Sequence, residues 1–108
     1  MRLQLPHSIA AYFQADLSDA VSVSECFTED AIVKDEGNTY SGREAIRDWK
    51  EKSSSKYKYI AEPFSIDEAG EQTIVTAHVV GDFPGSPVDL RYFFGLHAGK
   101  IASLEVKL

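Results

Sequence analysis

The sequence has little cysteine, no long apolar run and few basic residues. Cys26 is the single cysteine among 108 residues, which excludes an internal disulfide and a metal cage built from cysteines. His7, His78 and His97 lack the spacing of metal ligands, so no metal is expected. No stretch approaches the roughly 20 apolar residues of a membrane-spanning helix, and MRLQLPHSIAAYF lacks the apolar core of a secretory signal. We therefore expect a cytoplasmic protein without a membrane partner.

Positive charge is also scarce, because 11 lysines and arginines stand against 17 acidic residues, for a formal net charge of −6. Nucleic acids and anionic membranes are bound by basic patches, so neither is expected as a partner. The nearest approach to a patch is Lys50, Lys52, Lys56 and Lys58, interleaved with Glu51 and serines, which we interpret as the solvent-exposed end of a helix. The sequence also lacks a cofactor-binding motif, and no cofactor is expected.

What remains is an ordinary globular composition, with 44% hydrophobic and 26% charged residues. A chain of this length suits one domain, which we expect to span 1–108. Apolar residues recur at helical spacing in three segments of the first half, and strands with short turns between them follow at 56–67, 72–83, 88–97 and 100–107. Helices followed by an antiparallel meander predict an α+β fold.

A further strand, Ala31 to Asp35, raises the question of where its last side chain points. Strand side chains alternate between faces, so Asp35 shares a face with Ala31 and Val33. If the two apolar residues face the core, the carboxylate does too, which is costly unless the protein gains something from it. Asp35 is therefore the first candidate for a functional residue.

Several strands are apolar on both faces, which a sheet with one solvated face does not require. Tyr92-Phe93-Phe94 is the clearest case, and Ile74-Val75 and Val79-Val80 show the same pattern. Three short helices can cover only one face of such a sheet. We expect a second copy of the chain to cover the other face in a symmetric homodimer, with His78 on that outer side.

Residues 26–49 allow the pattern to be named. FTEDAIVKDEG, followed by YSGREAIRDW, resembles the signature of the nuclear transport factor 2-like superfamily, and more narrowly its SnoaL-like polyketide cyclase and ketosteroid isomerase branch. The closing GKIASLEV is similar to that pattern too, so the resemblance covers nearly the whole chain. It implies a cone-shaped, cystatin-like roll, with N-terminal helices packed on a curved antiparallel sheet and an apolar pocket at the open end.

The resemblance also implies roles for individual residues. In the isomerase branch, the aspartate that ends the first strand is the base that moves a proton, and Asp35 falls on that position. Tyr12 on the first helix matches the tyrosine that stabilises the oxyanion. The second oxyanion partner is a late-strand aspartic acid, but counting back from AGK places Arg91 there, with Asp89 two residues earlier. Arg91 would either stabilise an oxyanion by its charge or pair with Asp35 and lower the pKa of that carboxyl.

Six residues are expected to line the pocket of such a fold: Trp49, Phe27, Val79, Asp89, Phe93 and Leu104. The function that the resemblance implies is the binding of a small apolar ligand, without established catalysis. One alternative is an enzyme of the isomerase or cyclase type that uses Asp35 as general base on a carbonyl substrate. Another is lyase chemistry like that of epoxide hydrolases or dehydratases, for which Asp89 and Arg91 would supply a carboxylate and a guanidinium on one face.

Overall fold

The helices lie in the first half of the chain and most of the strands in the second. The structure, a computed structural model, describes residues 4–108. Its elements are α1 (His7–Asp16), α2 (Ala20–Ser24), β1 (Phe27–Asp35), β2 (Asn38–Ser41), α3 (Arg43–Lys56), β3 (Tyr59–Ala69), β4 (Gln72–Gly81), β5 (Val88–His97) and β6 (Lys100–Lys107). The α+β class predicted from the sequence is confirmed. Among the described residues, no helix has the length and apolar character that a membrane crossing needs.

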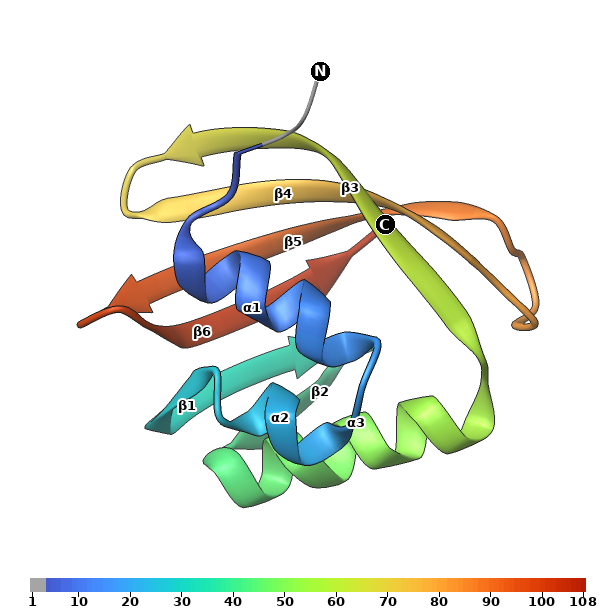
Figure 1. The fold of residues 1–108 in the computed structure, drawn as a ribbon, viewed down its shortest axis with the longest axis horizontal. Helices are drawn as coiled ribbons and strands as arrows, with labels where there is room; N and C mark the ends of the chain where they lie inside the picture. The colour runs from blue at the N-terminus through green and yellow to red at the C-terminus, as the bar shows by residue number, and fades with distance from the viewer. Residues whose placement is uncertain (1–3) are drawn as a thin grey trace.

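The strands form a curved, open sheet in the order β2-β1-β6-β5-β4-β3 (Figure 1). Strands β3 to β6 pair antiparallel with their neighbours, which is the meander that the short turns predict. Strands β1 and β2 form a hairpin, and β1 lies parallel to β6, so the sheet is mixed rather than wholly antiparallel. The parallel pairing brings Val33 of the first strand beside Leu104 of the last.

The inner face of the sheet is covered by α1, while α3 packs against β1 and β2 (Figure 1). The core on this face contains a cluster of aromatic side chains, whose neighbouring rings meet edge to face or stack: Tyr12, Phe13, Phe27, Tyr92 and Phe94. Full burial of one such side chain contributes about 1.5–3 kcal/mol. This cluster therefore fixes α1 against the middle of the sheet.

One residue in β6 decides which side chains of β5 face the core. An uninterrupted ladder from the turn at 98–99 would place Phe93 opposite Leu104. In the structure the register shifts, because Ala102 stays without a partner, and Phe94 lies opposite Leu104 instead. Such a bulge exchanges the faces of one strand relative to its neighbour. The even-numbered residues of β5 therefore point inward, and Phe93 points outward.

Gly81 lets the start of β3 approach β4 closely, at the place where Tyr59 begins the strand. A Cβ on Gly81 would collide with the carbonyl oxygen of Lys58 and lie 2.6 Å from Cβ of Tyr59, and neither neighbour can move without the backbone. We expect Gly81→Ala to lower the free energy of unfolding by about 1–3 kcal/mol, measured by urea denaturation.

The matched control is Gly95→Ala, where the new methyl group meets the hydroxyl of Ser103. Because that side chain can rotate away, the loss of stability should be clearly smaller than at Gly81. An equal loss for the two variants would contradict the close approach at the start of β3.

Candidate functional site

The carboxylate of Asp35 lies on the inner face of the sheet, as the alternation of β1 predicts. Ala31 and Val33 are buried, and Asp35 follows on the same side at the end of the strand. Its Oδ2 accepts a hydrogen bond of 3.0 Å from Nε1 of Trp49 on α3. The indole therefore fixes the orientation of the carboxylate, and the bond uses only one of the two carboxylate oxygens.

A second polar group lies where the end of α1, the middle of α3 and the start of β3 meet. Nζ of Lys50 is 2.7 Å from Oδ1 of Asp16 and donates a hydrogen bond of 2.7 Å to the hydroxyl of Tyr59. That hydroxyl donates in turn to Oδ1 of Asp16, over 3.2 Å. The side chains of Lys50 and Asp16 are each only 5% exposed. The prediction that Lys50 belongs to a solvent-exposed helix end is therefore wrong.

Helical spacing explains why Lys50 is buried. Ile46, Trp49 and Lys50 occupy positions i, i+3 and i+4 of α3 and share its buried face. The ammonium lies over aromatic rings, 4.6 Å from the ring centroid of Trp49, 5.4 Å from that of Tyr59 and 5.6 Å from that of Tyr12. Cation–π attraction of this kind offsets part of the hydration that the ammonium loses on burial.

The negative charges of Asp16 and Asp35 act on the hydroxyls of three tyrosines. Burial, followed by the negative charge of Asp16, raises the pKa of Tyr12, Tyr59 and Tyr92. The charge of Asp35 raises the pKa of the same three phenols to a smaller extent. The phenols therefore stay protonated at neutral pH, and each of them can donate a hydrogen bond. We call these three tyrosines, with Asp16, Asp35, Trp49 and Lys50, the inner cluster.

Two of these hydroxyls have no hydrogen-bond partner within residues 4–108. In the part of the chain that the structure describes, Nε of Arg47 is the one fully buried side-chain nitrogen or oxygen that lacks a hydrogen-bond partner. The hydroxyls of Tyr12 and Tyr92 form no hydrogen bond within residues 4–108, although the two residues are buried, with 1% and 5% exposed. A ligand oxygen or a water molecule is the natural partner for such donors.

Arg91, Asp89 and Phe93 lie on the outer face of the sheet, and the prediction that they share a face with Leu104 is wrong. The unpaired residue in β6 causes the error, because it exchanges the faces of β5. Arg91 donates a hydrogen bond of 3.2 Å to the backbone oxygen of Leu108. The sheet separates it from the inner cluster, so the alternative of an ion pair with Asp35 is excluded.

The other predicted pocket residues have the expected orientation. Phe27, Val79 and Leu104 are buried on the inner side, and the ring of Phe27 lies 6.0 Å from that of Tyr12. Trp49 contacts Asp35 directly. That any of them touches a ligand remains a prediction.

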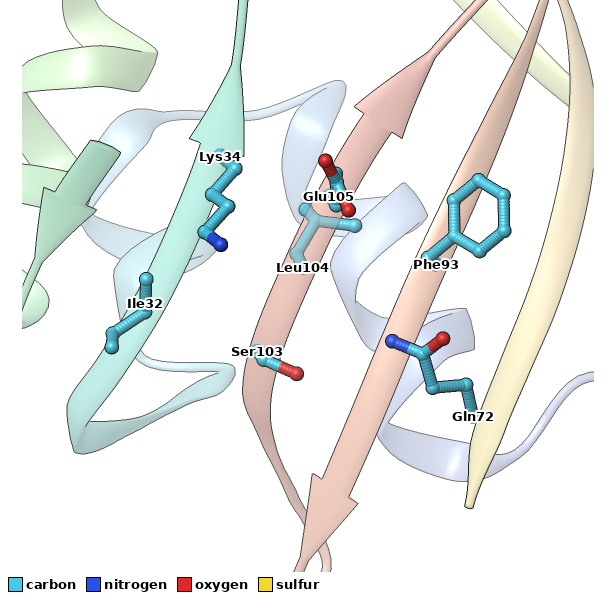
Figure 2. A pocket seen from close by; sticks show the side chains of 7 residues that line it. All are labelled: Ile32, Lys34, Gln72, Phe93, Ser103, Leu104 and Glu105. Carbon is cyan, nitrogen blue, oxygen red and sulfur yellow. The ribbon is translucent and has the colours of Figure 1, made fainter. Parts of the chain in front are cut away.

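Neither of two hollows on the described surface is the enclosed apolar pocket that the resemblance implies. The larger, of about 470 Å³, lies at the rim of the sheet between the turn at 36–39, residues 105–108 and Asp35. The smaller, of about 160 Å³, lies on the outer face over β1, β6 and β5. Figure 2 shows Lys34, Glu105 and Phe93 around this second hollow, with the helices behind the strands. The rim hollow reaches the inner cluster, through Asp35.

The inner cluster combines a proton acceptor with several hydrogen-bond donors. Within residues 4–108, no group of three or more His, Cys, Asp and Glu side chains could hold a metal ion. The carboxylate of Asp35 can accept a proton, while neutral phenols can stabilise negative charge on a ligand oxygen. This pairing suits proton transfer at a carbon next to a carbonyl group.

Sequence reasoning missed four members of the inner cluster: Asp16, Lys50, Tyr59 and Tyr92. For two of them the signal was present, because Asp16 follows Tyr12 by one helical turn and Lys50 follows Ile46 by one turn. No local signal marks Tyr92, since its orientation depends on a bulge in another strand.

Comparison with solved structures shows close similarity. A candidate polyketide cyclase from Sinorhizobium meliloti is 41% identical, with a TM-score of 0.90 over 95% of each chain. A protein with a ketosteroid isomerase-like fold from Catenulispora acidiphila, in complex with trimethylamine, is 19% identical, with a TM-score of 0.85 over 97% of this chain and 87% of that one.

A second candidate polyketide cyclase, from Pseudomonas putida, is 21% identical, with a TM-score of 0.73 over 99% of this chain and 92% of the other. No family model matches the chain, and no curated protein sequence matches it.

The raised pKa values of Tyr12, Tyr59 and Tyr92 predict how stability depends on alkaline pH. Below the pKa of a tyrosine in the unfolded chain, about 10, both states hold the phenolic protons and these groups add no pH dependence. Above it, the unfolded state releases protons that the folded state retains. The free energy of unfolding should then fall by about 1.4 kcal/mol per pH unit for each of the three phenols.

Urea denaturation at several alkaline pH values measures this slope, and ultraviolet titration counts the phenols that ionise. Tyr12→Phe should reduce the slope by the contribution of one phenol, about 1.4 kcal/mol per pH unit. Ionisation of all five tyrosines in the folded protein would contradict the burial of the inner cluster.

Proposed function

The chain belongs to the nuclear transport factor 2-like superfamily, in its SnoaL-like branch, and we propose that it is an enzyme of the isomerase or cyclase type. Its substrate is a small, flat, largely apolar carbonyl compound on which it moves a proton. The observation that carries this proposal is the position of the Asp35 carboxylate, which lies on the inner face beside Trp49 and is near enough to Tyr12 and Tyr92 for its charge to raise their pKa. The name of the 41% identical protein, a candidate polyketide cyclase, supports the same class of reaction.

Asp35 acts as the general base. Its carboxylate takes a proton from a carbon next to the carbonyl group, and the electrons of the broken C–H bond move onto the carbonyl oxygen. The resulting enolate then takes the proton back at a different carbon, or its carbon attacks a second carbonyl group to close a ring. Trp49 holds the carboxylate in place through the hydrogen bond from Nε1.

The enolate oxygen needs donors that are already in position. Tyr12 supplies one, from the apolar face of α1. Tyr92 supplies a second donor from the inner side of β5. It directly follows Arg91, the residue that counting back from AGK places at the position of the second oxyanion partner. A buried phenol with a raised pKa shares with a protonated carboxylic acid the property that matters here, namely a hydrogen-bond donor without charge.

The rim hollow supports a route for the substrate. It adjoins Asp35, and its volume of about 470 Å³ falls within the usual range for sites of small molecules. The lyase alternative loses its support, because the carboxylate of Asp89 and the guanidinium of Arg91 face away from the inner cluster. Binding without turnover is the second candidate, and it is favoured by the hydrogen bond that ties Asp35 to Trp49.

Replacement of Asp35 tests the proposed proton transfer. In heavy water, the wild-type protein should accelerate the exchange of acidic C–H hydrogens of 2-tetralone, a flat two-ring ketone, followed by NMR. Asp35→Asn should slow the exchange by about 100-fold or more, because an amide cannot accept the proton. Its melting temperature should stay near that of the wild type, since the amide oxygen still accepts the bond from Trp49.

Asp30→Asn is the matched control, because it removes an exposed carboxylate from the same strand without touching either hollow. That variant should exchange at the wild-type rate. Exchange that is the same in Asp35→Asn and in the wild type would leave ligand binding without turnover as the function.

We also propose that two copies of the chain associate through the outer face of the sheet. Ile60 and Val80 lie opposite each other on β3 and β4, and they are 55% and 49% exposed. Ile32 on β1 is 41% exposed and borders the hollow on the same face. Exposed apolar side chains that follow several strands of one sheet favour a symmetric contact between copies.

Light scattering tests this association. The wild-type protein should have about twice the 12.0 kDa mass of one chain, and Ile60→Glu should restore the single-chain mass, because it would bury two unpaired carboxylates. Leu17→Glu is the control, since Leu17 is an exposed apolar residue that follows α1, away from the sheet's outer face. A wild-type mass of one chain at every concentration would rule out the dimer.

A further inference from the structure

The orientation of the Asp35 carboxylate depends on Trp49. Nε1 of the indole donates the one side-chain hydrogen bond that this carboxylate accepts within residues 4–108, and it does so at Oδ2 only. Rotation of an indole about its Cβ–Cγ bond has broad, roughly two-fold preferences, so a single hydrogen bond does not fix the ring. Whatever else holds the indole therefore also decides where the candidate base points.

Lys50 contacts the face of this indole. Its Nζ lies 4.6 Å from the ring centroid of Trp49, within the range of a cation–π contact. Both residues are buried, with 4% of Lys50 and 5% of Trp49 exposed, and a cation–π contact is stronger where water is excluded. A positive charge over the ring also draws electron density away from Nε1, which makes its N–H a stronger donor to the carboxylate.

The ammonium is itself held by partners from two other elements. Nζ of Lys50 lies 2.7 Å from Oδ1 of Asp16, at the end of α1, and donates a hydrogen bond of 2.7 Å to the hydroxyl of Tyr59, at the start of β3. These partners and the aromatic rings enclose the ammonium, and Lys50 lines neither of the two hollows described above. Lys50 therefore acts on its neighbours and not on a ligand.

Stability of the fold does not by itself account for a charge in this place. Replacement of a buried ion pair by apolar side chains of similar size is often neutral or stabilising. An apolar pair at positions 16 and 50 could join α1 to α3 without the cost of removing two charges from water. Such a pair would not place a positive charge over the indole that holds Asp35.

We propose that Lys50 is a positioning residue for Asp35 and that it acts through the indole of Trp49. Asp16 and Tyr59 fix the ammonium, and the ammonium in turn fixes the ring of Trp49. Nε1 of that ring then fixes the carboxylate at the end of β1. Lys50 does not touch the substrate and takes no part in the proton transfer. This inference rests on the proposed function, because it concerns the orientation of the base proposed there.

The indole N–H of Trp49 reports on this arrangement without a substrate, because Trp49 is the only tryptophan of the chain. Its exchange with heavy water can be followed by proton–nitrogen NMR as the loss of a single indole signal. Exchange requires the indole to leave its position, so the rate follows how often the contacts of the ring break. The wild-type indole N–H should exchange slowly, and exchange as fast as in the urea-unfolded chain would overturn the inference.

The decisive variant is the double replacement Asp16→Asn/Lys50→Met, because Lys50→Met alone would leave a buried carboxylate without a partner. Its indole N–H should exchange about 10- to 30-fold faster than that of the wild type, the range for a desolvated cation–π contact. Circular dichroism checks the fold. If this variant does not fold, Asp16→Asn/Lys50→Gln, which keeps a polar group beside Tyr59, should show the same acceleration. A folded variant with the wild-type exchange rate would overturn the inference.

Tyr59→Phe is the matched control, because it removes one bond of the ammonium and leaves the charge over the indole. Its indole N–H should exchange at close to the wild-type rate. An acceleration as large as that of the double variant would show that the indole is held by the rigidity of the whole inner cluster. That result would overturn the role of the ammonium.

Deuterium exchange of 2-tetralone separates this inference from the proposed reaction. The folded double variant should have a kcat about 10-fold lower and a nearly unchanged KM, because the base is less often in place while substrate binding is not affected. A higher KM with an unchanged kcat would assign Lys50 to ligand binding and overturn the inference.

The two proposals can also fail separately. Faster exchange of the indole N–H in the double variant, without any tetralone exchange that depends on Asp35, supports the action of Lys50 on Trp49 and rejects the proposed reaction. Tetralone exchange that depends on Asp35 but is unchanged in the folded double variant leaves the reaction in place and rejects the role of Lys50.

Discussion

The contact on which the rest of the structure depends is the buried ion pair between Asp16 and Lys50, completed by Tyr59. It joins the end of α1 to the middle of α3 and the start of β3, which come much later in the sequence. Aromatic rings keep water away from it, which strengthens the attraction between the charges. The same exclusion of water keeps the neighbouring phenols protonated. The same aromatic side chains therefore stabilise the fold and keep the phenols of the candidate site protonated, so that they can donate hydrogen bonds.

Much of this arrangement follows from short-range patterns in the sequence. The inward orientation of Asp35 required only the alternation of five residues, because Ala31 and Val33 are too apolar to face water on a solvated sheet. Tyr12 could be placed on the buried side of α1 by helical spacing. Such patterns succeed where a side chain's surroundings are decided by neighbours within the same helix or strand.

The remaining errors have causes that lie outside the element concerned. The prediction for Phe93 is wrong because one unpaired residue in β6 shifts the ladder, and a bulge has no reliable signature in the sequence. The prediction that Lys50 faces solvent rests on the rarity of buried lysines, although its spacing from Ile46 places it on the buried face of the helix. Its charge is accommodated only because Asp16 and Tyr59, which belong to other elements, lie next to it. No local pattern in the sequence predicts such a contact between elements.

The parallel pairing of β1 with β6 has a consequence for the order in which the molecule assembles. The strand that carries Asp35 pairs on one edge with β2, which is close in the sequence. Its other edge pairs with β6, which lies near the far end of the chain. During synthesis on the ribosome, the meander of β3 to β5 can form before that edge is closed. Contacts so distant in sequence slow folding, and until they form an unpaired strand edge is exposed to other chains. The strand that orients the candidate base is thus among the last to complete its pairing in the sheet.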